Sequence, residues 1–197
     1  DSRRGAERTM IEELAAYEEK YPYRYGMKKA EVQCTHFQKV RPNVFDKMLE
    51  MLVEDGSIRR VDEFLCTPGY EVRKDQTFDR VSGILLDSFR DAGYDFVRYS
   101  EIGFSREDRM VSDDILNILL EEEKVVKVTE DMYTLKENME RAKELIQERF
   151  KEDPLITIAQ VRDMFGTRRK SAKPILESMD SIKVTKKTGA ESERIAY

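Results

Sequence analysis

Cys34, His36 and Cys66 are residues whose types could hold a metal ion or form a thiol–imidazole pair. The Cys-x-His spacing has no second paired motif of the kind that zinc sites use, and His36 is the only histidine. On a strand, Cys34 and His36 would share one face without being oriented for proton transfer. The sequence therefore predicts a small buried thiol beside a surface histidine, with no metal site and no catalytic residues.

Positively charged residues toward the C-terminal end could do a different kind of chemistry, the binding of phosphate groups. Arg168, Arg169 and Lys170 follow Thr167, a residue type that commonly caps a helix start. Cations in a first helical turn oppose the helix dipole, so local helix stability does not explain them. They fit a position where a phosphate meets outward-pointing N–H groups. The alternative explanation for such a run is a solvated charged face with no ligand.

A second basic element follows, in a pattern that predicts a β-hairpin wing. Lys183, Lys186 and Lys187 lead into the turn at 188–192, and Arg194 lies on the return strand. Only two aromatic residues follow position 153, Phe165 and Tyr197, so a stacking platform for extended single strands is disfavoured and a folded hairpin fits better. The candidate polyanion-binding residues are Thr167, Arg168, Arg169, Lys170, Lys173, Lys183, Lys186, Lys187 and Arg194.

The distribution of charge supports this interpretation, although the net charge of -5 does not. Residues 154–197 contain nine Lys or Arg against five acids, which gives +4 and leaves -9 for the residues before them. Such asymmetry predicts a polyanion-binding end on an acidic body. The apolar runs are short and broken by charge, and two cysteines suggest reduced thiols, so we expect a cytoplasmic protein that contacts no membrane.

The elements that must position these side chains recur three times along the chain. Each repeat reads as an amphipathic helix, a helical hairpin, and two strands joined by a turn. The apolar positions of the first helices in the second and third repeats correspond: Phe78, Val81, Ile84, Leu85 and Phe89 match Met139, Ala142, Leu145, Ile146 and Phe150. A helical hairpin followed by a two-stranded wing is the winged-helix pattern. The predicted fold class is α+β, mainly α, with three tandem winged-helix modules.

The module boundaries follow from the repeats as 1–74, 75–136 and 137–197. The linkers at 73–76 and 136–138 are short and lack Gly/Ser-rich tethers, so neighbouring modules should touch at a fixed angle. The return strands are expected at 69–72, 132–135 and 194–197. In the last module, Thr157 and Gln160 have the form of a capping box, and Gly166 should end that helix. The second helices of the first two hairpins, expected to start at Asn43 and Ser112, are acidic or neutral at their starts.

Two stretches resemble a known family. Residues 156–163 read Ile-Thr-Ile-Ala-Gln-Val-Arg-Asp, and residues 166–177 read Gly-Thr-Arg-Arg-Lys-Ser-Ala-Lys-Pro-Ile-Leu-Glu. Together they resemble the last winged helix of bacterial selenocysteine-specific translation elongation factors. Residues 21–32, Tyr-Pro-Tyr-Arg-Tyr-Gly-Met-Lys-Lys-Ala-Glu-Val, are similar to the family's Pro-x-Arg-x-Gly-Met segment. The resemblance covers the whole chain, and the terminal motif is its specific part.

The resemblance implies a full factor with an N-terminal GTPase that carries selenocysteinyl-tRNA, and a last winged helix that binds an mRNA hairpin beside a UGA codon. This chain has no Gly-x-x-x-x-Gly-Lys-Ser/Thr stretch, so GTP is expected in a part outside it, and the chain itself should be no enzyme and hold no cofactor. The implied partners are the mRNA hairpin and, through the full-length factor, the ribosome and selenocysteinyl-tRNA. We expect the chain to be a monomer.

Two other functions are compatible with the pattern. A winged-helix DNA-binding transcriptional regulator would use the same helix and wing charges in a duplex groove. Only one module has a basic second helix, however, and such regulators usually dimerise to span two half-sites. A protein-interaction scaffold is the second alternative, with the acidic first two modules docking to ribosomal proteins.

Overall fold

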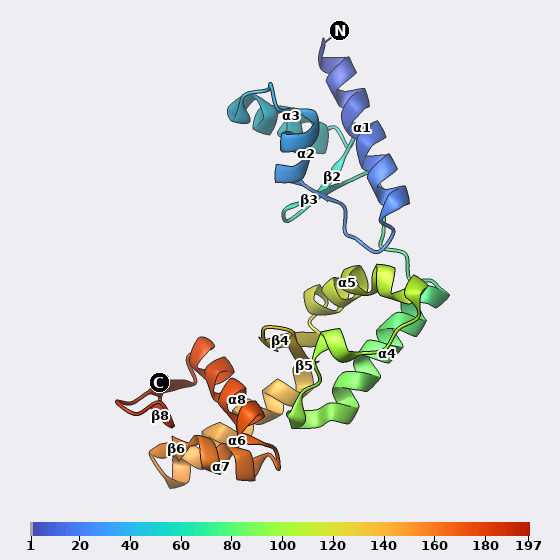
Figure 1. Cartoon of the computed structure of the whole chain (residues 1–197). Helices are drawn as coiled ribbons and strands as arrows, with labels where there is room; N and C mark the ends of the chain where they lie inside the picture. The colour runs from blue at the N-terminus through green and yellow to red at the C-terminus, as the bar shows by residue number, and fades with distance from the viewer. Residues whose placement is uncertain (1) are drawn as a thin grey trace. The chain divides into compact units, whose positions relative to one another are not determined.

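The structure, a computed structural model, describes residues 2–197, and the chain divides into two compact units (Figure 1). Unit 1 is Asp1–Phe78 and unit 2 is Asp79–Tyr197. One succession of elements is present once in unit 1 and twice in unit 2: a long helix, a short strand or bridge, a helical hairpin and a β-hairpin. This succession is the winged helix, so the predicted mainly helical α+β fold with three tandem winged helices is confirmed. We refer to them as the first, central and last winged helices.

The first winged helix folds around one apolar core. Phe45, Leu49 and Leu52 recur at helical spacing along one helix and are buried with Met10 and Leu14 from the first helix of the chain. The elements are α1 (Ser2–Lys20), β1 (Met27–Lys28), α2 (Lys29–His36), α3 (Pro42–Glu54), β2 (Arg59–Val61) and β3 (Phe64–Cys66). Packing of this face, more than helix propensity, therefore holds α3 in place.

Gly26 lets β1 approach the middle strand of the first sheet, whose order is β1-β3-β2. Its φ is +139°, and a Cβ at this position would lie 2.3 Å from the carbonyl oxygen of Leu65. A side chain has no room there, so the backbone conformation and the close approach both require glycine. Met27, the next residue, then pairs with Leu65.

The return strand of the first wing lies earlier than predicted. We expected it at 69–72, but β3 is Phe64–Cys66. The prediction was wrong because the wing is closed by a two-residue turn, Asp62 and Glu63, that contains no glycine. Asp62 takes a φ of +53° instead, a conformation that Asp tolerates better than most residues.

The central and last winged helices differ in their sheets. The central one contains α4 (Gln76–Ala92), the 3-10 helices η1 (Gly93–Asp95) and η2 (Tyr99–Glu101), α5 (Arg106–Glu121), β4 (Val125–Thr129) and β5 (Met132–Leu135). The last one contains α6 (Lys136–Glu152), β6 (Leu155–Thr157), α7 (Ile158–Met164), α8 (Arg169–Ser181), β7 (Thr185–Lys187) and β8 (Glu193–Ala196). The last sheet has the order β6-β8-β7, whereas the central hairpin gains only a single bridge between Arg98 and Met132.

Helix α5 begins earlier than the predicted start at Ser112. Its N-cap is Ser105, whose hydroxyl accepts a hydrogen bond from the backbone N–H of Asp108. Ser112 is buried inside the helix, and its hydroxyl donates to the carbonyl oxygen of Arg109 at 2.9 Å. A serine inside a helix can bond to the helix backbone instead of capping a helix start, so the residue type alone did not locate the start of α5.

The capping box at the start of α7 is confirmed. The backbone N–H of Gln160 donates to Thr157 Oγ1 at 3.2 Å, and the backbone N–H of Thr157 donates to Gln160 Oε1 at 2.9 Å. Gly166 follows the helix with a φ of +59°, as a terminating glycine does. These local signals fix where the chain turns into α8.

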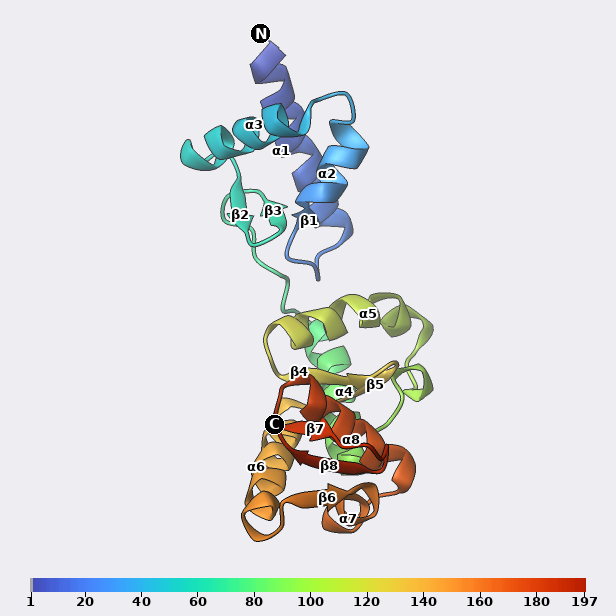
Figure 2. The same cartoon turned by 90° about the vertical axis from the view of Figure 1, so that its left-hand side faces the viewer.

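The central and last winged helices share one core. Phe96 and Met132 of the central winged helix are buried in the same apolar cluster as Ile175, Leu176 and Met179 of α8. Helix α8 also packs beside β4 (Figure 2). The predicted linker at 136–138 is wrong, because α6 starts directly after β5. The division at 1–74, 75–136 and 137–197 stays a prediction, and by packing its last two parts form one unit.

Candidate nucleic-acid interface

The start of α8 is the most basic exposed helix start of the last winged helix. Arg168 is its N-cap, and Arg169 and Lys170 are the first two helical residues. All three side chains are exposed, the first turn contains no acidic residue, and none of the three has an ion-pair partner among residues 2–197. Cations that are neither paired nor needed to stabilise the helix remain available for an anionic ligand.

Burial on the opposite side of α8 sets this orientation. Ala172, Ile175 and Met179 face the shared core, so Arg169 and Lys173, which are one helical turn apart, face solvent. Pro174 lies inside the helix, just beyond its first turn, and α8 nevertheless continues to Ser181.

Thr167 does not cap α8 and anchors its start instead. Its hydroxyl lies 2.9 Å from the carbonyl oxygen of Tyr94 and 2.7 Å from Asp95 Oδ1, and Ser171 Oγ donates to the carbonyl oxygen of Asp95 at 3.0 Å. Phe165 packs on Tyr94, with ring centroids 4.7 Å apart. The hydroxyl of Thr167 is thus engaged by the central winged helix, so we do not count Thr167 among the residues that could meet nucleic acid.

Lys173 of α8 and Lys187 of the wing converge on one carboxylate. Lys187 Nζ lies 3.2 Å from Glu191 Oε1, and Lys173 Nζ lies 3.8 Å from the same oxygen and 3.7 Å from Glu177 Oε1. The hydrogen bond and charge of Lys187 lower the pKa of the Glu191 carboxyl, and Lys173 adds to this effect. Two elements that are distant in sequence therefore present positive charge at one place.

Arg194 was predicted to bind nucleic acid, and the structure contradicts this. Its side chain is 0% exposed, and its Nε lies 2.9 Å from Asp180 Oδ2. Its Nη1 donates to the carbonyl oxygens of Glu191 at 2.6 Å and Glu193 at 3.0 Å. Arg194 holds the wing onto α8, and none of its side chain reaches solvent, including the buried Nη2, which has no hydrogen-bond partner among residues 2–197.

Among the described residues, Lys183 and Lys186 take no part in the ion pairs around Glu191. Lys186 neighbours Lys187 on β7, and successive strand residues point to opposite faces of a sheet. Lys183 lies beyond the far end of α8, with its Nζ 5.7 Å from the centroid of the Tyr197 ring. It lines a shallow cavity with Lys143, Tyr197 and neighbouring residues. We therefore separate these two lysines from the site.

The remaining five predicted cations form what we call the basic surface: Arg168, Arg169, Lys170, Lys173 and Lys187. Sequence reasoning missed the residues that shape it. Asp180 and Glu191 were counted only as charges. An acid at the end of the helix before the wing was nevertheless a signal that it could pair with Arg194 of the return strand. Asp95 carried no signal, because its contact with Thr167 depends on how two winged helices pack.

The cysteines and the histidine do not form a reactive site. Cys34 is exposed and Cys66 is buried, and both are free. Cys34 and His36 lie on helix α2 rather than on a strand, two residues apart and hence on different sides of it. His36 Nε2 lies 3.3 Å from Glu13 Oε2. The prediction of a buried thiol beside a surface histidine was therefore wrong for Cys34.

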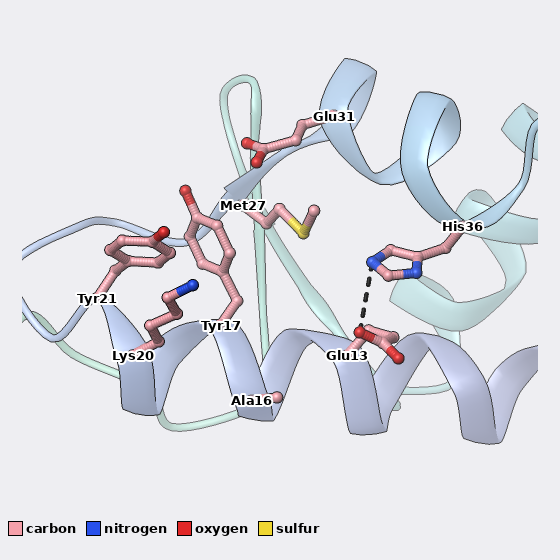
Figure 3. A pocket seen from close by; sticks show the side chains of 8 residues that line it. All are labelled: Glu13, Ala16, Tyr17, Lys20, Tyr21, Met27, Glu31 and His36. Carbon is pink, nitrogen blue, oxygen red and sulfur yellow. Dashed lines mark ion pairs between the residues drawn. The ribbon is translucent and has the colours of Figure 1, made fainter.

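The His36–Glu13 pair borders a cavity of about 270 Å³ between α1, β1 and α2 (Figure 3). Tyr17, Tyr21 and Lys20 line its other side. Within residues 2–197, no group of three His, Cys, Asp or Glu side chains is placed to hold a metal ion. In the same residues, no helix is long and apolar enough to span a bilayer. The cavity thus mixes aromatic rings with side chains of both charge signs.

The fold and the basic surface define a class, tandem winged-helix proteins with a basic helix and wing. Residues 11–65 and 148–191 match family models described as "Elongation factor SelB, winged helix", and together they span about half of the chain. The matches lie in the first and last winged helices. The chain belongs to the winged-helix region of the selenocysteine-specific elongation factor (SelB) family.

Relatives extend the same comparison. A selenocysteine-specific elongation factor from Desulfomicrobium baculatum is 24% identical over 182 residues, which are 91% of this chain and 28% of that protein. A crystal structure of a bacterial selenocysteine-specific elongation factor, EF-Sec, aligns with 99% of this chain and 30% of its own, at 15% identity and a TM-score of 0.56. The mRNA-binding domain of SelB from E. coli, solved in complex with SECIS RNA, aligns with 62% of this chain and 98% of its own, at 17% identity and a TM-score of 0.48. This chain thus spans less than a third of the length of the curated relative.

Proposed function

We propose that this chain binds a hairpin in mRNA through its last winged helix and so holds a selenocysteine-specific elongation factor near the ribosome for selenocysteine insertion at UGA. Family membership supports the assignment to selenocysteine insertion. The observation that carries the RNA part is the convergence of α8 and the wing, where Lys173 and Lys187 reach the same carboxylate oxygen. Arg168, Arg169 and Lys170 precede them at the start of α8 and have no ion-pair partner within residues 2–197.

The basic surface suits the backbone of a folded RNA better than an extended strand. It contains five cations and no aromatic ring on which a base could stack. Phe165, one of the two aromatics near it in sequence, packs against Tyr94. Cations that contact phosphates set register and affinity, while an arginine that reaches an unpaired base adds sequence preference.

The other activities of the factor belong to its remaining parts in this proposal. GTP binding and delivery of selenocysteinyl-tRNA are assigned to the regions that the curated relative has beyond this chain's 28% share. We assign no catalytic residue, cofactor or metal to the chain itself, and we propose that it acts as a cytoplasmic monomer that reaches the ribosome through the full-length factor.

Binding of the full chain to a hairpin from a selenoprotein message tests this proposal. Replacing Arg168 and Arg169 together by Ala should weaken binding by on the order of 1–3 kcal/mol if either reads a base. If they bind phosphates only, the loss is smaller and the log–log salt slope becomes shallower by about 0.7–0.9 for each phosphate that the variant no longer neutralises. Fluorescence anisotropy at several salt concentrations measures both quantities.

Arg41→Ala is the matched control, because Arg41 is the exposed N-cap of α3 in the first winged helix just as Arg168 is the N-cap of α8. It should leave the affinity and the salt slope unchanged. Full affinity in the Arg168/Arg169 double variant would refute the assignment. Equal or tighter binding of duplex DNA of the same length would favour the transcriptional regulator instead.

A further inference from the structure

The Glu191 carboxylate lies between α8 and the wing, at a position where cations of both elements can hold an anion. Its Oε1 lies 3.2 Å from Lys187 Nζ and 3.8 Å from Lys173 Nζ, so two ammonium groups from different elements point at one oxygen atom. Glu177 also lies near Lys173, at 3.7 Å, but among residues 2–197 only Glu191 lies within ion-pair distance of both lysines. A phosphate oxygen placed there would meet the same two donors.

The backbone that carries Glu191 is fixed, whereas its side chain is free to leave. The carbonyl oxygen of Glu191 accepts a hydrogen bond from Arg194 Nη1 at 2.6 Å, and Arg194 is locked by Asp180. Just before Glu191 in the same turn, the backbone N–H of Ala190 donates a hydrogen bond to Thr188 Oγ1. The Glu191 side chain is 58% exposed. Its carboxylate can therefore swing into solvent without disturbing the wing.

We propose that the Glu191 carboxylate occupies the position of an RNA phosphate oxygen and is displaced when RNA binds. This inference rests on the proposed function and assigns to the same site a residue that opposes binding. Before RNA binds, the Glu191 carboxylate partly neutralises Lys173 and Lys187. When RNA binds, the two lysines exchange this carboxylate oxygen for a phosphate oxygen.

The exchange discriminates between ligands. An exposed ion pair is weak, so displacing Glu191 costs little for a ligand that is already positioned by other interactions. Arg168, Arg169 and Lys170, which are exposed at the start of α8, supply those interactions when the RNA has the right shape. A polyanion that engages only the two lysines gains little, because it replaces a carboxylate already present. Glu191 thereby favours a shaped hairpin over non-specific RNA.

Glu191→Gln in the full chain tests the inference. The amide keeps the shape and the backbone hydrogen bond to Arg194 but removes the charge. With a selenoprotein-message hairpin as probe, we expect binding about two- to fivefold tighter. The log–log salt slope should steepen by about 0.7–0.9, as for one additional neutralised phosphate. An unrelated RNA duplex should gain at least as much, which lowers the ratio of hairpin to duplex affinity.

Glu177→Gln is the control, since this carboxylate also neutralises Lys173 yet does not reach Lys187. It should change the slope less than Glu191→Gln does. In the Glu191→Gln/Lys187→Gln double variant the gain should disappear. Suppose that the wild type binds the hairpin and that Glu191→Gln, with an unchanged unfolding midpoint, binds it with equal or lower affinity. That result would overturn this inference alone. Absence of hairpin binding by the wild-type chain would overturn the proposed function as well.

Discussion

Lys187 and Arg194 are paired in register across the last wing, yet their side chains have opposite tasks. Lys187 is 51% exposed and reaches Glu191 at the rim of the wing, whereas Arg194 is fully buried against Asp180. The difference follows from what each side chain meets. Asp180 lies in the last turn of α8 and also accepts a hydrogen bond from Thr185 Oγ1 at 2.6 Å, so it is already placed to receive the guanidinium.

Arg194→Ala should destabilise the protein instead of only weakening RNA binding. It leaves the largely covered Asp180 without its cation and removes two hydrogen bonds to the wing turn, so we expect a loss of roughly 3 kcal/mol in the free energy of unfolding. Urea unfolding measures this, with Arg168→Ala as a surface control that should leave stability unchanged. Normal stability together with weakened RNA binding would return Arg194 to the ligand-binding residues.

The sequence could identify which residues carry charge at this site but not which of them meet solvent. Arg168, Arg169 and Lys170 are exposed, as an RNA contact requires, and their contact with RNA stays a prediction. Arg194 looked identical in sequence, and its burial depends on a strand placed over α8 by tertiary packing. Thr167 likewise has the type of a helix cap, but a backbone carbonyl of the central winged helix takes its hydroxyl.

At the scale of elements, local signals predicted what local interactions decide. The Thr157–Gln160 capping box is closed within four residues, so its prediction held. The wing turn at Asp62 and the start of α5 were misplaced because an unusual φ and a buried serine depend on surroundings that residue types do not reveal.

The start of α5 also gives a pH-dependent contribution to stability. Arg80 of α4 binds the buried Asp108 with two hydrogen bonds, of 2.7 and 2.9 Å. These bonds lower the pKa of the Asp108 carboxyl. A carboxyl whose pKa is lower in the folded than in the unfolded protein stabilises the fold fully above its unfolded pKa of about 4, and this stability is lost as the pH falls through the lower, folded value.

Asp108→Asn should therefore destabilise the protein at neutral pH, and the difference from wild type should shrink as the pH falls below about 4. Urea unfolding over that pH range measures the difference. A difference that stays constant with pH would show that Asp108 acts by shape or hydrogen bonding and not by its charge.

At the scale of the whole molecule, the central and last winged helices form one compact unit. Phe96 enters the shared core with a φ of +50°, and Thr167 and Ser171 tie the start of α8 to η1. The short linker predicted that these modules would touch. The sequence could not show that they share a core, because Met132 and Ile175 each also fit the core of an isolated module. The residues of the basic surface all lie in the last winged helix, but contacts with the central winged helix help to hold the start of α8 that carries them.

Mapping of backbone amide chemical shifts in the full chain, with and without a selenoprotein-message hairpin, tests the central claim most directly. The account predicts shift changes that cluster at 168–173 and at the wing turn 187–191. Helix α3 and the cavity around Lys143, Lys183 and Tyr197 should show little change. Changes concentrated on α3 or on that cavity, with 168–173 unaffected, would contradict it.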